Sequence, residues 1–440
     1  MVRPRFGSDI GWTVDKTVAQ TLLEDLEWRG LIAQQSNHEG LAEHLQSEPR
    51  TLYCGFDPTA DSLHIGSLVP LLLLRRFQQA GHRPILLLGG ATGLIGDPSF
   101  KDDERSLNDA DTVESWVASL QRQVRPFLDF EGPAAASIVN NLDWTRSMDV
   151  ISFLRDIGKH FSVNAMIQRD SVRNRLERAD QGISYTEFSY MLLQSMDFLK
   201  LAESHNCTLQ VGGQDQWGNI VSGVDLIRRH LAKEAFALTH PLITKADGTK
   251  FGKTAGGAVW LDPHKTSPYS FYQFWLNTAD ADVVNYLKFF TFLNQGEISA
   301  LAEETETAPE HRAAQKQLAA EVTQLVHGEE AVVSAQRIST ALFGGELSAL
   351  QPQDLEQLQL DGMDSTAVNP GQGLLSVMVE AGVAKSTGEA RKLVQGGGVR
   401  LNGSQVQDPR AELDFADALY GEFFVMRKGK KVYHLITKAG

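Results

Sequence analysis

The feature that most constrains the fold is an alternation of apolar extended runs with helical stretches in the first third of the chain. An extended run from Thr51 to Phe56 ends in a polar turn, and a helix from Ser67 to Ala80 follows. A second apolar run, "HRPILLLGGATG", passes from His82 to Gly93. Strands that alternate with longer helices favour a parallel sheet with crossover helices. We expect its Gly-rich strand ends to point into one crevice.

The same alternation returns further along the chain. "CTLQVGGQDQWGNI", which ends at Ile220, predicts another strand, turn and helix. Between the two regions, residues 108–146 predict a helical insertion, and residues 161–177 and 185–205 predict two long helices. Turn-forming residues after Thr244 predict a mobile loop. The fold class is therefore α/β, with a Rossmann-like parallel sheet.

The remaining chain predicts further domains, as its 440 residues suggest. We expect the α/β domain over 1–256, with N-terminal helices and the helical insertion. Aromatic residues at helical spacing predict a helical domain over 257–343, and an acidic stretch predicts a linker with one short helix over 344–370. A capping pair, Ser386 and Glu389, and a hairpin around Asn402-Gly403 predict a small α+β domain over 371–440.

Composition excludes several classes of protein. Two cysteines, Cys54 and Cys207, are too few for a disulfide framework or a Cys-rich zinc site, so we expect a reducing cytoplasm and no protein-bound zinc. No signal peptide or membrane span is expected. A net charge of -14 argues against a broad nucleic-acid surface, but residues 371–440 hold ten Lys or Arg against seven Asp or Glu. The tail is therefore the basic end.

Two short motifs suit phosphate. In "HIGS", His64 and the amides of a helix N-terminus can meet an anion while Gly66 leaves room for a ligand. In "KFGKT", Lys250 and Lys253 lie in a Gly-containing loop that can close over a polyphosphate. Taken alone, each has a plainer interpretation, a helix cap for the first motif and a solvated turn for the second.

Three further stretches suit polar ligands. In "GDPSFKDDER", Asp97 can hold an ammonium group, and Lys101 and Arg105 can reach phosphate. Tyr190, Gln194 and Asp197 share one helical face, either lining a buried polar pocket or facing solvent. In "GGQDQWGN", Asp215 and Gln216 suit sugar hydroxyls, although turn chemistry also explains that stretch. Their joint occurrence, in this order, favours the functional interpretation.

This order resembles the class I aminoacyl-tRNA synthetases, since HIGS is similar to their HIGH signature and KFGKT to their KMSKS loop. More narrowly, "YCGFDPTADSLHIGS", "GDPS", "SYMLLQSMDF" and "GGQDQWGN" resemble bacterial tyrosyl-tRNA synthetases, from about Leu31 to the C-terminus. The tail from Gly373 to Lys438 resembles their S-four-type RNA-binding domain. The resemblance implies a cytoplasmic homodimer that uses ATP and magnesium to join L-tyrosine to tRNA(Tyr), with the helical domain reading the anticodon.

The resemblance also implies roles for individual residues. Tyr53 and Asp197 match groups that hydrogen-bond the substrate phenol, Tyr190, Gln194 and Asp97 match those that hold its ammonium, and Gln210 supports that pocket. Cys54, Asp215 and Gln216 match contacts to the ATP ribose, with Gly213 leaving room for it, and Gly55, Asp57, Gly66 and Ser67 match other parts of the ATP site. Thr59 and His64 match groups that hold the γ-phosphate. Lys101, Arg105, Lys250, Lys253 and Thr254 match loops that enclose pyrophosphate.

Two positions depart from the general signatures: Ser67 stands where HIGH has its last His, and Phe251, Gly252 and Thr254 differ from KMSKS. The phosphate-contacting lysines remain, so activity is still expected. Three alternatives stay open at this point. A tryptophanyl enzyme is disfavoured by the Tyr53 and Asp197 pair, which suits a phenol better than an indole. The others are a non-catalytic RNA-binding protein and a small-molecule adenylyltransferase.

Overall fold

The structure is a computed structural model that describes residues 21–97, 108–169, 172–173, 176, 183–249, 251–254, 257–342, 345–429 and 432–439, with the backbone alone at Lys253 and Thr254. The contacts between residues divide the chain into two compact units. The first holds the chain up to Leu261 together with Ala279–Ala314, and the second holds Asp262–Thr278 and the chain from Gln315 onward.

A six-stranded sheet forms the centre of the first unit, in the order β1-β6-β5-β2-β3-β4. Its strands are β1 (Gln34–Gln35), β2 (Thr51–Phe56), β3 (Arg83–Leu88), β4 (Ser137–Asn140), β5 (Cys207–Gly213) and β6 (Phe236–His240). Only β1 runs antiparallel to its neighbour among these strands. The chain leaves β2 toward β3 and later returns to the other side of β2 with β5, so the order of strands reverses there. Sheets of this kind bind ligands at such a reversal, beyond the carboxyl ends of the strands.

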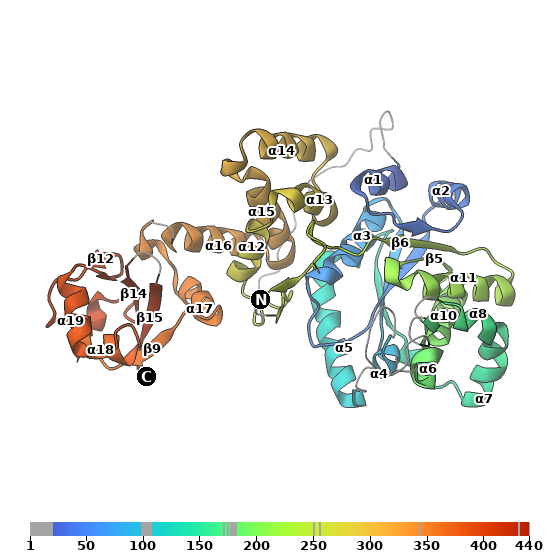
Figure 1. Cartoon of the computed structure of the whole chain (residues 1–440). Helices are drawn as coiled ribbons and strands as arrows, with labels where there is room; N and C mark the ends of the chain where they lie inside the picture. The colour runs from blue at the N-terminus through green and yellow to red at the C-terminus, as the bar shows by residue number, and fades with distance from the viewer. Residues whose placement is uncertain are drawn as a thin grey trace. The chain divides into compact units, whose positions relative to one another are not determined.

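Helices cover both faces of this sheet, with α3 and α5 on one face and α10 and α11 on the other (Figure 1). The helices of this unit are α1 (Leu22–Arg29), α2 (His38–Ser47), α3 (Leu68–Gln79), α4 (Thr92–Ile95), α5 (Ala110–Val124), α6 (Leu142–Thr145), α7 (Val150–Ser152), α8 (Val163–Ile167), α10 (Tyr185–His205), α11 (Trp217–Leu231), α13 (Asp280–Phe290) and α14 (Gln295–Thr307). Because helices cover both faces, the inner strands read as continuous apolar runs such as Ile85–Leu88, all buried.

Two sequence expectations about this unit differ from the structure. The segment 108–146, expected to be helical, contains α5 but also the edge strand β4. Its β-branched Ile138 and Val139 suit a strand, and pairing with β3 decides the matter. Within residues 161–177, α8 ends at Ile167 and a turn follows at 168–169, although residues 172–173 and 176 are again helical. By contrast, α10 runs for 21 residues from the Ser184 cap to Asn206, whose φ of 51° ends it.

The second unit joins helices to a small mixed sheet. Its helices are α12 (Pro268–Leu276), α15 (Ala313–His327, which begins at the boundary between the units), α16 (Glu329–Leu342), α17 (Pro352–Leu360), α18 (Leu374–Glu380) and α19 (Thr387–Gln395). Its five-stranded sheet has the order β12-β11-β14-β15-β9, from β9 (Ser365–Val368), β11 (Val399–Leu401), β12 (Ser404–Gln405), β14 (Phe423–Lys428) and β15 (Val432–Lys438). A separate ladder pairs β10 (Gln372–Gly373) with β13 (Glu412–Leu413).

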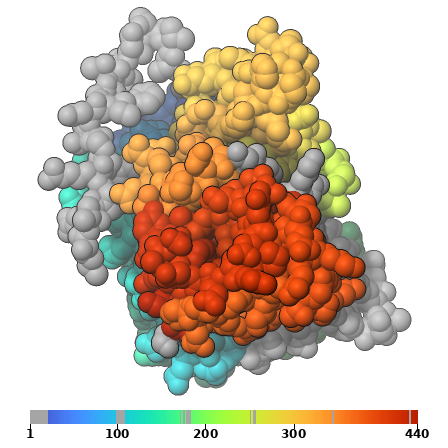
Figure 2. Space-filling view, turned by 90° about the vertical axis from the view of Figure 1, so that its left-hand side faces the viewer, coloured from blue at the N-terminus to red at the C-terminus, as the bar shows by residue number. Residues whose placement is uncertain are grey.

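Local signals account for the elements of the C-terminal part. Ser386 caps α19 by accepting from the Glu389 amide, as its sequence predicts. Asn402 and Gly403, with φ of 48° and 86°, turn the β11–β12 hairpin, and such dihedrals favour these two residue types. Figure 2 shows the residues from about 350 onward, in orange and red, packed together.

The stretch expected to be a linker is folded over its described residues. It contains α17, the short helix that was expected, and β9, which pairs with β15. Leu350, Leu355 and Leu358 are buried in one apolar cluster with residues of β14 and β15. The expectation of a linker rested on the acidic composition of this stretch. It did not take into account Leu355 and Leu358, which lie three residues apart, as on one face of a helix.

Candidate active site

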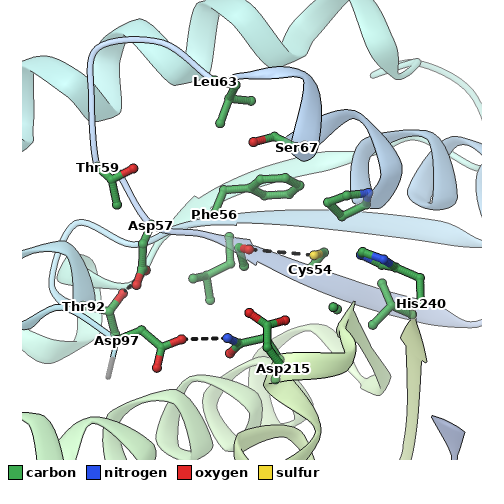
Figure 3. A pocket seen from close by; sticks show the side chains of 18 of the residues that line it. Cys54, Phe56, Asp57, Thr59, Leu63, Ser67, Thr92, Asp97, Asp215 and His240 are labelled. Atoms are coloured by element: carbon green, nitrogen blue, oxygen red, sulfur yellow. Dashed lines mark hydrogen bonds between the residues drawn. The ribbon is translucent and has the colours of Figure 1, made fainter. Parts of the chain in front are cut away.

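One cavity of about 600 Å³ opens beyond the carboxyl ends of β2, β5 and β6, where the strand order reverses. Sixteen residues proposed from the sequence line it: Tyr53, Cys54, Gly55, Asp57, Thr59, His64, Gly66, Ser67, Asp97, Tyr190, Gln194, Asp197, Gln210, Gly213, Asp215 and Gln216. Lys101, Arg105 and Lys250 lie outside the described residues, and for Lys253 and Thr254 only the backbone, in strand β7 (Lys253–Thr254), is described. Figure 3 shows several of these side chains directed into the same space.

The HIGS segment forms the N-terminal cap of the helix that follows it. The Nδ1 atom of His64 accepts from the amide of Gly66 at 3.0 Å. Burial lowers the pKa of His64, so the neutral ring carries its proton on Nε2, which can donate to a ligand. A Cβ at Gly66 would lie 2.8 Å from the His64 ring, so a larger residue there would displace the ring from this capping position. Capping and anion binding are therefore compatible roles.

Backbone hydrogen bonds hold the two signature segments together. The amide of Ile65 donates to the carbonyl of Val259 at 3.0 Å, and that of Leu261 donates to Leu63 at 2.9 Å. The Val259 amide in turn donates to the carbonyl of Gly252, inside KFGKT, at 3.2 Å. Gly252 has a φ of 83°, which favours glycine. Segments almost 200 residues apart in the sequence thus border one site.

The Asp197 carboxylate lies at the buried end of the cavity and accepts two side-chain hydrogen bonds. Asn141 Nδ2 donates to Oδ2 at 2.9 Å, and Trp144 Nε1 donates to Oδ1 at 2.8 Å. Burial raises the pKa of Asp197 to about 7, although both hydrogen bonds oppose that rise. Each oxygen keeps a further lone pair that can accept from a ligand hydroxyl.

A chain of hydrogen bonds joins Asp197 to the mouth of the cavity. Besides its bond to Asp197, Asn141 donates to Thr92 Oγ1 at 3.0 Å, and Thr92 donates to Asp57 Oδ1 at 2.6 Å. Tyr190 also donates to Asp57, at 2.6 Å. Sequence reasoning missed Thr92, Asn141 and Trp144. Asn141 and Trp144 follow β4, a strand within the segment that was expected to be helical.

Several buried polar atoms in this cavity have no hydrogen-bond partner among the described residues. They are the hydroxyl of Tyr53 and the side-chain carbonyl oxygens of Gln194 and Gln210. Tyr53 is 1% exposed, and burial, together with the nearby Asp197, raises its pKa well above the usual value, so it stays a protonated donor. An unpaired buried polar group costs about 1–3 kcal/mol, so these atoms favour a polar ligand that pairs with them.

A second polar group lies at the β5 end of the cavity. Gln216 Nε2 donates to Asp97 Oδ2 at 2.6 Å, which joins residues that the sequence had assigned to different parts of the ligand. Burial and the neighbouring Asp97 raise the pKa of Asp215. A Cβ at Gly213 would lie 2.4 Å from the Asp215 carboxylate, so a larger residue there would displace that side chain. Burial raises the pKa of Cys54 to about 12, which keeps its thiol protonated at neutral pH.

No cluster of three or more His, Cys, Asp or Glu side chains within the described residues is arranged to hold a metal ion. In that same part of the chain, no helix combines the length and the apolar character needed to cross a bilayer.

The fold and the site define an α/β nucleotide-binding protein, with a capped helix N-terminus and a Gly-containing loop at the reversal of strand order. The family model of class I tRNA synthetases for tryptophan and tyrosine matches residues 45–344. That of the tyrosine–tRNA ligase SYY-like C-terminal domain matches residues 354–436.

Proteins that are similar in sequence over most of the chain define its family more narrowly. The tyrosine–tRNA ligase of Aliivibrio fischeri strain ES114 is 57% identical over 421 residues, 95% of this chain and 99% of the relative. That of Salmonella newport is 57% identical over 419 residues, with the same coverage of each chain. The chain therefore belongs to the tyrosine–tRNA ligase family, within the class I aminoacyl-tRNA synthetases.

Solved structures agree on the fold. A C-terminally truncated mitochondrial tyrosyl-tRNA synthetase from Aspergillus nidulans is 31% identical, with a TM-score of 0.67 over 74% of this chain and 96% of that one. A tryptophanyl-tRNA synthetase from Plasmodium falciparum is 14% identical, with a TM-score of 0.52 over 70% of this chain and 84% of that one. The second likeness concerns the fold alone.

Proposed function

We propose that this ATP-dependent ligase activates L-tyrosine to tyrosyl-adenylate and then transfers the tyrosyl group to the 3'-terminal ribose of tRNA(Tyr). The observation that carries the proposal is one cavity with unpaired polar groups around Tyr53 and Asp197 at one end and the HIGS cap at the other. The cavity belongs to a chain that is 57% identical to tyrosine–tRNA ligases over 95% of its length.

Tyrosine occupies the end of the cavity around Asp197. Its phenol donates to Asp197 and accepts from the Tyr53 hydroxyl, which satisfies an otherwise unpaired group. Its ammonium lies near Tyr190, Gln194 and Asp97, while Gln210 supports the pocket. Phenylalanine would leave the Tyr53 hydroxyl without a partner and would give no hydrogen bond to Asp197 beyond those from Asn141 and Trp144. Enzymes of this type are the standard example of discrimination by that cost.

ATP occupies the end of the cavity around the HIGS cap. Cys54, Asp215 and Gln216 contact the ribose, and Gly55, Asp57, Gly66, Ser67 and Gly213 line the space around the nucleotide. His64 donates from Nε2 to a phosphate oxygen, beside Thr59. Lys101, Arg105, Lys250, Lys253 and Thr254 enclose the pyrophosphate that leaves. Magnesium would be bound by the ATP phosphates and would offset their charge.

The reaction needs no nucleophilic side chain. A carboxylate oxygen of tyrosine bonds to the α-phosphorus of ATP while the bond to the β-phosphate oxygen breaks, and pyrophosphate leaves with that electron pair. The ribose hydroxyl of tRNA then attacks the acyl carbon, and AMP leaves. Catalysis therefore consists of positioning and of charge stabilisation by the groups around the phosphates.

We also propose that two copies of the chain form a homodimer. The support is a set of exposed apolar side chains in the first unit: Val150, Ile151, Leu154, Val163, Ile167, Leu176 and Tyr185, each 41% to 71% exposed. Their segments pack together through Met166 and Met191. An apolar surface of this kind marks an interface, and a second copy is the partner that is always present.

The tRNA partner engages both units in this proposal, with anticodon recognition by helices in 257–343 and further contacts from the basic tail over 371–440. We propose the cytoplasm as the compartment, and the two free, buried cysteines, Cys54 and Cys207, suit its reducing conditions.

The decisive experiment measures exchange of labelled pyrophosphate into ATP with tyrosine, phenylalanine or tryptophan, for the wild type and Asp197→Asn. We expect exchange with tyrosine alone, weakened in the variant. Exchange driven by tryptophan would overturn the tyrosine pocket, and exchange with none of the three would overturn the adenylation step.

A further inference from the structure

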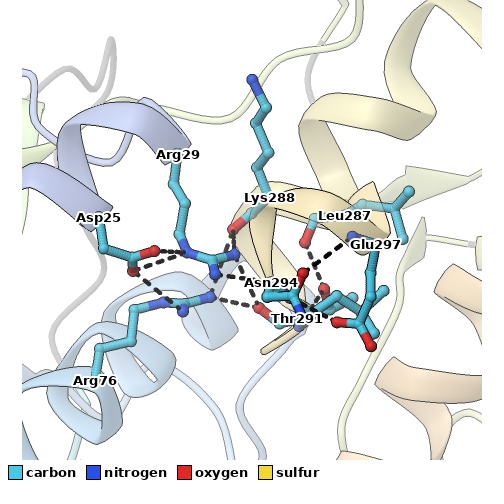
Figure 4. Close-up of polar contacts among 9 residues, drawn as sticks. Asp25, Arg29, Arg76, Leu287, Lys288, Thr291, Asn294 and Glu297 are labelled. Carbon is cyan, nitrogen blue, oxygen red and sulfur yellow. Dashed lines mark hydrogen bonds and ion pairs between the residues drawn. The ribbon is translucent and has the colours of Figure 1, made fainter. Parts of the chain in front are cut away.

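The C-terminal end of α13 is held by two buried arginines from distant elements (Figure 4). Arg29, on α1, donates to the carbonyl oxygens of Lys288 at 3.2 Å and Leu293 at 2.8 Å. The last carbonyls of a helix lack partners within it and form the negative end of its dipole. A guanidinium group there both pairs these oxygens and favours the local charge.

The second arginine connects this helix end to the helix that HIGS begins. Arg76, on α3, donates to the carbonyl of Thr291 at 2.5 Å. Asp25 lies between the two cations, 2.9 Å from Arg29 Nε and 3.8 Å from Arg76 Nη1. The helix that starts at the predicted phosphate site is therefore fixed at its far end to α13.

Helix α13 also contacts the segment that leads into KFGKT. Asp282, which is 8% exposed, accepts from the backbone amide of Ala246 at 2.7 Å. The hydroxyl of Tyr286 donates to the carbonyl oxygen of Thr244 at 3.4 Å. The chain that enters the loop is thus bonded to the first two turns of α13.

The loop itself contacts α13 through Phe251, which lies between Lys250 and Lys253 in the sequence. Its ring stacks on Phe290, with 5.3 Å between centroids and 22° between planes. It meets Tyr286 edge to face at 5.0 Å. Aromatic pairs in these geometries attract each other beyond the effect of the area they bury.

We propose that α13 positions the KFGKT loop for ATP, with Phe251 held in the slot between Tyr286 and Phe290 and with Asp282 fixing the entry to the loop. This inference rests on the proposed function and adds positioning residues to it. Because α3 and the loop are both attached to α13, the two phosphate-binding segments share one support. A displacement of about 1 Å in such a support can cost about a hundredfold in rate.

The test compares Phe251→Ala with Phe289→Ala. Phe289 lies on the same helix, but its ring lies near Gly30 instead of the loop. We expect Phe251→Ala to lower kcat for tyrosine-dependent pyrophosphate exchange at least about tenfold, or to raise KM for ATP by a similar factor. The equilibrium affinity for tyrosine without ATP should stay within about twofold of wild type. Phe289→Ala should leave all three quantities near wild type, and Phe251→Met, which keeps an apolar side chain in the slot, should restore most of the rate.

A second pair tests the entry to the loop. Asp282→Asn keeps an oxygen that can accept from the Ala246 amide, whereas Asp282→Ala removes it. We expect the rate to fall in the alanine variant and to be largely retained in the asparagine variant.

Three outcomes would overturn the inference: a Phe251→Ala enzyme with wild-type constants, a parallel loss of tyrosine binding, or an equal defect in Phe289→Ala. A wild-type protein without tyrosine-dependent exchange would instead contradict the proposed function, so the two failures are distinguishable.

Discussion

At the scale of single residues, the orientation of Asp197 depends on two side chains that no ligand need touch. Asn141 and Trp144 each occupy one lone pair of its carboxylate, so the remaining lone pairs have fixed directions. A carboxylate held in this way is prepared for one ligand geometry. This is the kind of support that a specific site requires.

Replacing Trp144 by Phe removes one of these donors and keeps most of the ring. Hydrogen bonds to charged groups contribute about 1.5–3 kcal/mol, so we expect kcat/KM for tyrosine to fall about tenfold or more. KM for ATP should change little, because the proposed nucleotide site is at the other end of the cavity. Steady-state exchange kinetics with each substrate varied in turn measure both, and equal changes for tyrosine and ATP would contradict a local role.

The pKa of Asp197, raised by burial to about 7, predicts a pH dependence. Below that pKa the carboxyl group carries a proton and no longer accepts a hydrogen bond as a carboxylate does. We therefore expect the affinity for tyrosine to weaken as the pH falls from about 8 to 6, by up to about tenfold per unit below the pKa. Equilibrium dialysis without ATP measures this affinity, and the Asp197→Asn variant should show a flat profile. A flat wild-type profile would mean that Asp197 does not titrate in this range.

At the scale of elements, α17 is joined to α16 by an ion pair between a buried carboxylate and a partly exposed arginine. Asp354, which is fully buried, accepts from Arg337 at 2.6 and 2.8 Å and from Ser334 at 2.6 Å. Its Oδ2 also accepts from the amide of Gln351, at the start of α17. One carboxylate therefore joins two helices and caps one of them.

The Asp354→Ala variant removes the acceptor of Arg337 and Ser334, and hydrogen bonds to a charged group contribute about 1.5–3 kcal/mol. We expect urea unfolding to begin at a lower concentration, while tyrosine-dependent exchange persists in the native protein because the cavity lies in the other unit. Glu356→Ala, at an exposed position of the same helix, is the matched control. Equal stability of the two variants would show that this ion pair does not hold α17.

At the scale of the whole molecule, the exposed apolar side chains between Val150 and Tyr185 predict the oligomeric state. We expect the wild type to sediment as a dimer and the double variant Ile151→Asp/Tyr185→Asp to sediment as a monomer, because desolvated carboxylates oppose association. Val333→Asp adds a charge at a residue that is 51% exposed in the second unit, and it should leave the dimer intact. Analytical ultracentrifugation distinguishes the species, and a dimeric double variant would place the interface elsewhere.

The sequence by itself determined the elements that local signals specify. Apolar runs, turn residues and caps were enough to predict β2, α3, β5 and α11, the cap at Ser386 and the hairpin at Asn402-Gly403. The motifs also singled out sixteen residues that line one cavity, and the ligand contacts proposed for them stay predictions. The elements could be predicted because each depends on neighbours within a few positions.

Only the tertiary structure decided which distant groups meet. The β4 strand exists because β3 offers it a parallel edge, and with it come Asn141 and Trp144 against Asp197. The leucines of the expected linker are buried because β14 and β15 present an apolar face. Phe251 stacks on Phe290 of α13, which lies about 40 residues further along the chain, and no repeating pattern in the sequence relates the two positions. Such pairings depend on contacts between residues that are far apart in the sequence. These contacts stabilise the protein only once folding has brought the residues together.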